Sequence, residues 1–315
     1  MNQTKSKNLT IIAASANYLP ELNALLNSID YWKIDTDIAL LSYKLPSNYL
    51  TKIKETFNFN IEIIQAPEGE QTKMTAIERF RIAYTEGKNY EAILILDADM
   101  FFMSNVDLYF QVASKGFIVC ASNSMIISFD KGKDGYQDHY GVFLDEEKYP
   151  YPEIHTSVPI WLSPQDLDWF QALYNARRTD HFDDFLLLNL LGIKMGKNKK
   201  MITLPAYRCT NIHHTMLKPC IGTIRKGDLV LSGTEEKMVS AHGKWADEAY
   251  VKDLAKVMEG FFRDEQLGER QRRQMLNSRE ILLEEFMKYT YLKKLNLREF
   301  VQIEWLEEKL KKKNF

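Results

Sequence analysis

The stretch Ala92-Ile93-Leu94-Ile95-Leu96-Asp97-Ala98-Asp99 decides the fold. A short run of apolar residues that stops at charged residues is typical of a strand buried on both faces. A segment with helical spacing, residues 73–85, precedes this run. Helices must cover both faces of such a strand, so the stretch predicts an α/β sheet whose strands run mainly parallel.

The residues before this stretch repeat the alternation of strand and helix. Apolar runs and helical spacing predict strands at 9–14, 37–41 and 61–64 and helices at 19–29, 48–57 and 73–85. We expect Ser47 to cap the second of these helices, because serine is a favoured N-cap residue. The first hundred residues therefore predict successive strand-helix units of one sheet.

The rest of the chain divides into a mixed part and a helical part. The mixed part predicts a short helix near Leu108, strands at 117–121 and 158–162, a helix opened by Ser163-Pro164, a helix at 184–191 and a long polar loop at 123–152. From about residue 246, segments rich in Glu, Arg, Lys and Leu contain no proline and predict helices. We therefore expect one domain at 1–245 and a helical C-terminal appendage at 246–315.

Composition excludes several classes of function. Of the 315 residues, 45% are hydrophobic and 27% are charged, which is typical of a globular protein, and a net charge of −2 predicts no nucleic-acid partner. The three cysteines are an odd number without a C-x-x-C pair, which indicates a reducing compartment. With no apolar window of about 20 residues, we expect a cytoplasmic protein. Basic clusters after residue 246 leave open a peripheral membrane contact or a homodimer through these helices.

Asp97 and Asp99 end the apolar run and are the candidate metal ligands. Ligands of parallel sheets bind at the carboxyl ends of the strands, and two carboxylates spaced i, i+2 suit a hard divalent cation that also binds phosphate oxygens. Acidic pairs also cap helices, and the apolar residues on both sides of this pair favour the functional interpretation. A dehalogenase-like phosphatase motif is excluded because Met100 and Phe101 follow, and the chain contains no P-loop.

Three segments of the chain resemble the GT-A glycosyltransferases, and family 8 most closely. They are Ile11-Ile12-Ala13-Ala14-Ser15-Ala16-Asn17-Tyr18, then Leu96-Asp97-Ala98-Asp99, then Val239-Ser240-Ala241-His242-Gly243-Lys244-Trp245. The resemblance implies a Rossmann-like, mainly parallel sheet flanked by helices, with Asp97, Asp99 and His242 as metal ligands. The sequence departs from the family where Ser15 and Ala16 replace a usual acidic residue, and where the third motif is shorter and lacks its proline.

The resemblance also implies the other site residues. It implies that the nucleotide sugar is bound by Ala13, Ala14, Ser15, Tyr18, Arg79, Ala98, Gly243 and Lys244. It implies that Thr156 and Ser157 contact the donor sugar or the acceptor. Asp183 and Asp184 are the candidate catalytic pair, with one acting as general base in inverting members or positioning the sugar in retaining members. Aspartate also caps helices, so one of the pair is free to act as an N-cap.

These observations predict a metal-dependent glycosyltransferase. The expected cofactor is Mn²⁺ or Mg²⁺, and the expected donor is a UDP-sugar. We expect the enzyme to transfer a hexosyl group to a glycan, a lipid-linked acceptor or a protein. One alternative is a nucleotide-sugar-binding protein that has lost catalysis. Another is a sugar nucleotidyltransferase, which carries a glycine-rich basic loop after its first strand, where this chain has Ala14-Ser15-Ala16-Asn17-Tyr18.

Overall fold

A computed structural model of the chain describes residues 5–66, 72–122, 156–167, 200–204, 209–211, 223–225, 228–230, 237–243 and 284–290. The predicted loop at 123–152, the predicted helix at 184–191 and most of the predicted appendage lie outside the described residues. None of the helices in the described part is both long enough and apolar enough to span a membrane.

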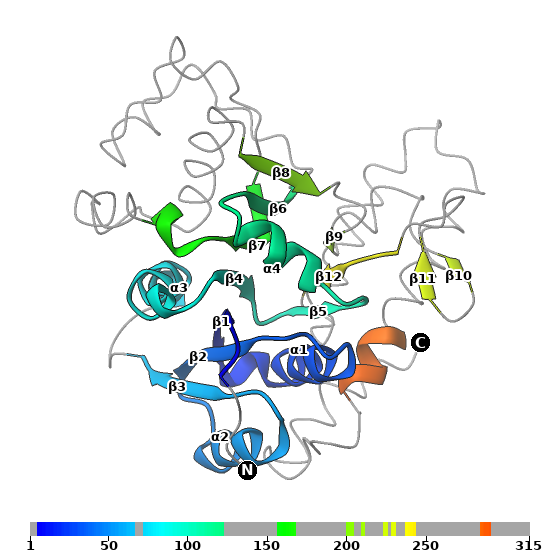
Figure 1. The fold of residues 1–315 in the computed structure, drawn as a ribbon. Helices are drawn as coiled ribbons and strands as arrows, with labels where there is room; N and C mark the ends of the chain where they lie inside the picture. Colours follow the sequence, from blue (N-terminus) through cyan, green and yellow to red (C-terminus); the bar gives the residue numbers. More distant parts are fainter. Residues whose placement is uncertain are drawn as a thin grey trace, which may run out of the picture.

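A seven-stranded sheet forms the centre of the molecule, in the order β3-β2-β1-β4-β7-β6-β8 (Figure 1). Its strands are β1 Asn8–Ser15, β2 Asp37–Tyr43, β3 Ile61–Gln65, β4 Ala92–Asp97, β6 Ile118–Ser122, β7 Thr156–Leu162 and β8 Met201–Leu204. Strands β3, β2, β1 and β4 run parallel, and β7 is antiparallel to both β4 and β6. The predicted α/β fold with a mainly parallel, Rossmann-like sheet flanked by helices is confirmed.

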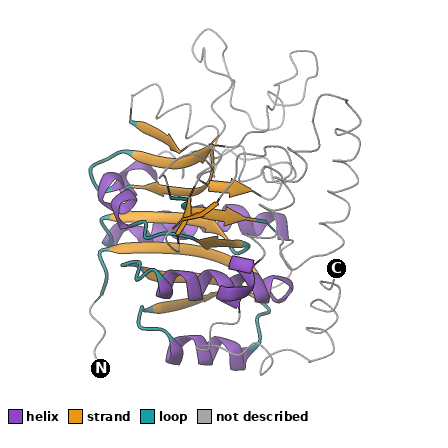
Figure 2. Ribbon diagram, turned by 90° about the vertical axis from the view of Figure 1, so that its right-hand side faces the viewer, coloured by secondary structure: helices purple, strands orange, loops and turns teal. Residues whose placement is uncertain are grey.

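The helices of the first half occupy their predicted positions: α1 Leu19–Tyr31, α2 Ser47–Thr56, α3 Thr72–Glu86 and α4 Asp107–Ala113. Helices α1 and α3 lie on opposite sides of β1 (Figure 1), and in Figure 2 the strands of the sheet run across the view one above another. The prediction for Ser47 is wrong, because Ser47 is the first helical residue and not the N-cap. Pro46 is the N-cap, because its φ of −57° and ψ of 132° are not helical and the helix begins at the next residue. The helix therefore begins one residue earlier than predicted.

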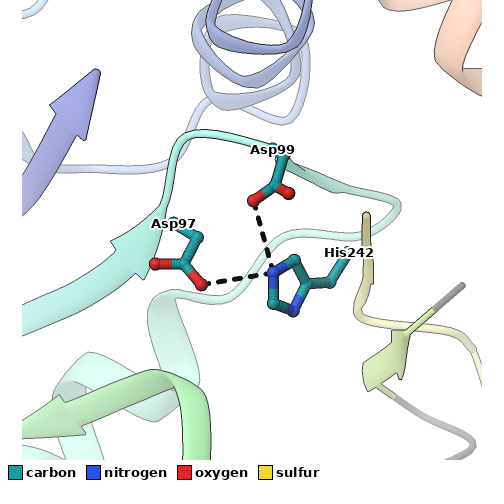
Figure 3. A group of neighbouring side chains, drawn as sticks. All are labelled: Asp97, Asp99 and His242. Carbon is teal, nitrogen blue, oxygen red and sulfur yellow. Dashed lines mark ion pairs between the residues drawn. The ribbon is translucent and has the colours of Figure 1, made fainter. Parts of the chain in front are cut away.

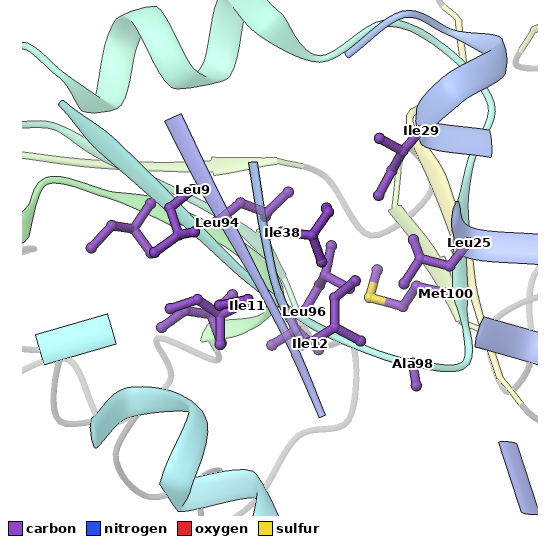
Figure 4. Packing of buried hydrophobic residues seen from close by; sticks show 14 of the residues in the cluster. Leu9, Ile11, Ile12, Leu25, Ile29, Ile38, Leu94, Leu96, Ala98 and Met100 are labelled. Carbon is purple, nitrogen blue, oxygen red and sulfur yellow. The ribbon is translucent and has the colours of Figure 1, made fainter. Parts of the chain in front are cut away.

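The core lies between the sheet and its helices. Ile11 and Ile12 of β1 and Leu94 and Leu96 of β4 are fully buried, which explains why these strands carry apolar side chains on both faces (Figure 4). Leu25 of α1 belongs to the same cluster. Tight packing of this kind fixes where the strands end, and therefore where the polar residues that follow them lie.

Two smaller sheets accompany the central one. Strand β5 Met100–Phe102 follows β4 directly and belongs to a three-stranded sheet of order β5-β12-β9, with β9 Cys209–Asn211 and β12 Ser240–His242. Strands β10 Thr223–Arg225 and β11 Asp228–Val230 form an antiparallel pair. Residues 284–290 are helical and lie beside α1, in orange in Figure 1. Neither small sheet was predicted from the sequence.

Candidate metal centre

The carboxyl ends of β1 and β4 lie side by side at one edge of the central sheet. The two strands are parallel neighbours, and Ala13 pairs with Asp97. Residues Ala13 to Ser15 therefore end beside the acidic turn, and the 3-10 helix η1 Ala16–Tyr18 continues from them. Ligands of parallel α/β sheets bind at this edge. Of the predicted nucleotide-sugar residues, Ala13 is thus next to Asp97, and Ala14, Ser15 and Tyr18 follow it along the chain. Their contact with a nucleotide stays a prediction.

His242 reaches the acidic turn through backbone pairing between β12 and β5. The two strands are antiparallel, and His242 pairs with Met100. The backbone N–H of Gly243 donates to the carbonyl oxygen of Asp99 at 2.9 Å. Gly243 has a φ of 143°, in the region that favours glycine, so a side chain at this position would strain the connection. Main-chain hydrogen bonds therefore place the imidazole opposite the residue that follows Asp99.

Three side chains from these elements converge on one point (Figure 3). The Nε2 atom of His242 lies 3.2 Å from Oδ2 of Asp97 and 3.3 Å from Oδ1 of Asp99. One ligand atom from each residue lies within 4.8 Å of the other two. Neighbouring ligands of an octahedral cation with bonds of about 2.1 Å stand about 3 Å apart. Two carboxylate oxygens and an imidazole nitrogen at these spacings fit a divalent cation.

Arg79 of α3 fixes the orientation of the Asp97 carboxylate. Its side chain is only 2% exposed, and its Nη1 atom donates to the carbonyl oxygen of Leu96 at 2.6 Å and to Oδ1 of Asp97. The other oxygen of Asp97, Oδ2, is the one that faces His242. Arg79 was predicted to contact phosphate or donor sugar. Its contacts with Asp97 and Leu96 make it a positioning residue for the metal ligands, and its contact with substrate stays a prediction.

The charges of the cluster balance one another. Burial raises the pKa of Asp97, but Arg79 and His242 outweigh burial and hold that pKa well below its usual range. Burial lowers the pKa of His242, but the carboxylates of Asp99 and Asp97 outweigh burial and raise it to about 10. Without a cation, the imidazole therefore carries a proton at neutral pH and stands between two carboxylates. A metal ion would replace that proton, because a histidine ligand must be deprotonated.

The remaining predicted residues fall in two groups. Ala98 is buried in the turn between the two aspartates. Thr156 and Ser157 begin β7, and because β7 is antiparallel to β4, its amino end lies at the edge where β4 ends. Asp183, Asp184 and Lys244 lie outside the described residues.

The strand that carries His242 to the site was not predicted from the sequence. Strands β5 and β12 have three residues each, which is too short for a periodic pattern. The one signal was the pair Phe101-Phe102, two fully buried residues directly after an acidic turn. Such a pair indicates that the chain stays in the core after the turn and pairs there with another segment.

No protein-family model and no curated protein sequence matches the chain. Among solved structures it is similar to the bifunctional glycosyltransferase WbbM, with 13% identity and a TM-score of 0.47 over 66% of this chain and 40% of WbbM, so the chain spans less than half of WbbM. It is also similar to an active-site mutant of LgtC, with 12% identity and a TM-score of 0.47 over 79% of this chain and 95% of LgtC. A 4-diphosphocytidyl-2C-methyl-D-erythritol synthase from Anaerococcus prevotii has 15% identity and a TM-score of 0.42 over 63% of this chain and 86% of its own. Similarities this distant decide nothing about the reaction, which must be argued from the side chains of the site.

Proposed function

We propose that the chain is a divalent-metal-dependent glycosyltransferase of the GT-A type, which moves a sugar from a nucleotide-diphosphate donor to an acceptor hydroxyl. The convergence of Asp97, Asp99 and His242 at the carboxyl edge of the sheet carries this proposal. Cations held by a few carboxylates keep positions for substrate phosphates. The end of β1, where the resemblance expects the nucleotide, lies directly beside this cluster.

Each residue of the cluster has a separate task in this proposal. Asp97, Asp99 and His242 hold the cation, and Arg79 holds Asp97 in the orientation that exposes Oδ2. The cation supplies positive charge that stabilises the departing diphosphate. We expect Mn²⁺ to be preferred over Mg²⁺, because Mg²⁺ is the harder ion and favours an all-oxygen ligand set.

The other roles follow from the resemblance. Lys244 binds the diphosphate. Asp183 or Asp184 deprotonates the acceptor hydroxyl or positions the sugar. Thr156 and Ser157 contact the sugars. The donor is a UDP-sugar, with hexosyl transfer to a glycan, lipid-linked or protein acceptor.

A thermal-shift screen of nucleotide sugars, each with Mn²⁺ and with a chelator, tests this proposal. A ligand at about 100 times its Kd stabilises the native state by about 2.7 kcal/mol, so a cognate donor raises the Tm measurably. We expect the Mn²⁺-dependent part of the shift to disappear in Asp99→Ala and to persist in Glu55→Ala, which removes an exposed carboxylate on α2. A shift that survives Asp99→Ala or the chelator would refute the metal site.

Turnover separates the proposal from the two alternatives. A glycosyltransferase hydrolyses its donor slowly without acceptor and releases the nucleoside diphosphate. A binding protein without catalysis would show the thermal shift and no release. A sugar nucleotidyltransferase would instead form pyrophosphate from a nucleoside triphosphate and a sugar phosphate. Either of the last two results would overturn the proposed reaction while leaving the metal site intact.

A further inference from the structure

The helical residues 284–290 are fastened to α1 by two buried asparagines. The side-chain amides of Asn23 and Asn27 donate to the carbonyl oxygens of Thr290 and Tyr289, each at 2.9 Å. Each amide thus ties one main-chain carbonyl of the segment to α1. Both asparagines are at most 1% exposed. The two asparagines lie one helical turn apart on α1, and their hydrogen bonds to this segment explain why polar side chains are buried there.

The same segment packs against β5, the strand that follows Asp99. The ring of Phe101 lies 6.0 Å from the ring of Phe286 and 5.7 Å from that of Tyr289, centroid to centroid. Phe286 and Tyr289 are at most 1% exposed. Contacts between aromatic rings at these distances add to the stability that burial supplies. The segment therefore covers the face of β5 that Phe101 presents.

One shared donor joins α1, β5 and the segment. The indole Nε1 of Trp32, which follows α1, donates to the carbonyl oxygen of Phe102 at 3.0 Å and to the hydroxyl of Tyr289 at 2.9 Å. The backbone N–H of Phe102 donates to the hydroxyl of Ser28 at 3.0 Å. Strand β5 is thus held by α1 along one side and by Tyr289 across its face.

Strand β5 is also the strand on which the metal centre depends. Its first residue follows Asp99, and its other edge pairs with β12 through Phe101 and Ala241 and through Met100 and His242. A strand of three residues makes few ladder hydrogen bonds and depends on packing for a fixed position. Any shift of β5 would therefore move both Asp99 and His242 relative to Asp97.

We infer that Tyr289 and Phe286 are positioning residues for the metal centre, acting through β5. This inference rests on the proposed metal site. Although both residues fall in the predicted appendage, they hold the strand between Asp99 and its pairing partner β12. The segment 284–290 thereby helps to hold Nε2 of His242 at 3.2 Å from Asp97 and 3.3 Å from Asp99.

Mn²⁺ titration of full-length variants tests the inference, with Tyr289→Ala, Tyr289→Phe and Phe57→Ala compared to wild type. Loss of an outer-shell support weakens metal binding by about 10- to 100-fold, so we expect the Kd of Tyr289→Ala to rise at least about tenfold. Tyr289→Phe keeps the ring and should recover most of that loss. Phe57, equally buried after α2 and stacked on Phe59, is the matched control whose truncation should leave the Kd unchanged.

Hydrogen exchange without metal gives a second readout. The backbone N–H groups of Met103 and Gly243 bond to Val239 and Asp99 across the junction of β5 and β12. We expect both amides to exchange faster in Tyr289→Ala and to be unaffected in Phe57→Ala. If Tyr289→Ala fails to fold, Trp32→Phe removes the shared donor instead and should accelerate the same two amides.

The outcomes separate this inference from the proposed function. If wild type binds Mn²⁺, Asp99→Ala does not, and Tyr289→Ala binds like wild type with unchanged exchange, the inference is wrong and the metal site stands. If wild type does not bind Mn²⁺, the proposed function fails. In that case faster exchange of Met103 and Gly243 in Tyr289→Ala would still support the role of the segment in holding β5, and unchanged exchange would overturn it.

Discussion

Two aspartates stand at opposite edges of the same sheet, and their surroundings differ. Asp37 begins β2 at the amino edge, is 5% exposed, and accepts hydrogen bonds from Asn60, from the hydroxyl of Tyr90 and from the backbone N–H of Ser6. Asp97 ends β4 at the carboxyl edge, and its side chain is 29% exposed. Its partners are the cationic groups of Arg79 and His242 rather than neutral donors.

The difference distinguishes a carboxylate bound by neutral donors from one that belongs to the proposed metal site. Neutral donors bind both oxygens of Asp37 and join β2 to the residues that precede β3 and β4. Burial and the nearby charge of Asp37 raise the pKa of Tyr90 to about 12. The carboxyl edge instead concentrates two carboxylates around one exchangeable proton. In the proposed metal site, a cation would bind by displacing that proton.

The largest effect that follows is a pH dependence of metal binding. His242 has a pKa of about 10, so each Mn²⁺ ion must displace a proton at any pH below that value. We therefore expect the affinity for Mn²⁺ to rise about tenfold per pH unit between about pH 6 and about pH 8. Calorimetry in two buffers of different ionisation enthalpy should detect one released proton. A histidine with the ordinary pKa of about 6.5 would instead give an affinity that levels off above pH 7.

Removing the cation beside Asp97 should have the next largest effect. Arg79→Gln frees the Asp97 carboxylate to rotate, so we expect Mn²⁺ affinity to fall about 10- to 100-fold, as for other outer-shell partners of metal ligands. Breaking a buried ion pair from one side also costs about 3 to 5 kcal/mol of stability, which urea unfolding would measure. Arg81→Gln is the matched control on the same helix, because Arg81 pairs with Glu78. Equal Mn²⁺ affinities of the two variants would refute the positioning role of Arg79.

The smallest effect is expected at the amino edge. Tyr90→Phe removes one of the three neutral donors to Asp37, and the two other hydrogen bonds remain. We expect the free energy of unfolding to fall by about 1 kcal/mol, the usual contribution of a single hydrogen bond. The affinity for Mn²⁺ should not change. A variant with wild-type stability but weaker metal binding would show that the two edges are not independent.

The sequence predicted the central fold because each strand from β1 to β4 is a continuous apolar run. Burial on both faces demands such a run, and helices with regular spacing separate the runs. The start of α2 was misplaced by one residue because both Ser47 and Pro46 suit the beginning of a helix. The antiparallel direction of β7 leaves no trace in composition, since it depends on the path of the chain before the strand.

The candidate site was predicted residue by residue but not as a structure. The acidic pair was visible because it ends an apolar strand, and His242 followed from the resemblance. The pairing of β5 with β12 was not predictable, because three-residue strands have no period and their partners are far apart in the chain. Arg79 was selected for its charge, whereas its contact with Asp97 depends on how α3 packs against β4. Tyr289 had no signal, because its role depends on a tertiary contact with Trp32.

Pulsed electron paramagnetic resonance of bound Mn²⁺ tests the central claim most directly, because it detects nitrogen atoms bonded to the ion. We expect a coupling from one ligated nitrogen in wild type and its loss in His242→Gln, with the ion still bound weakly by Asp97 and Asp99. The chain has six histidines, so the variant is needed to assign the nitrogen. A spectrum of wild type without nitrogen coupling, or a coupling that survives His242→Gln, would contradict the proposed metal centre.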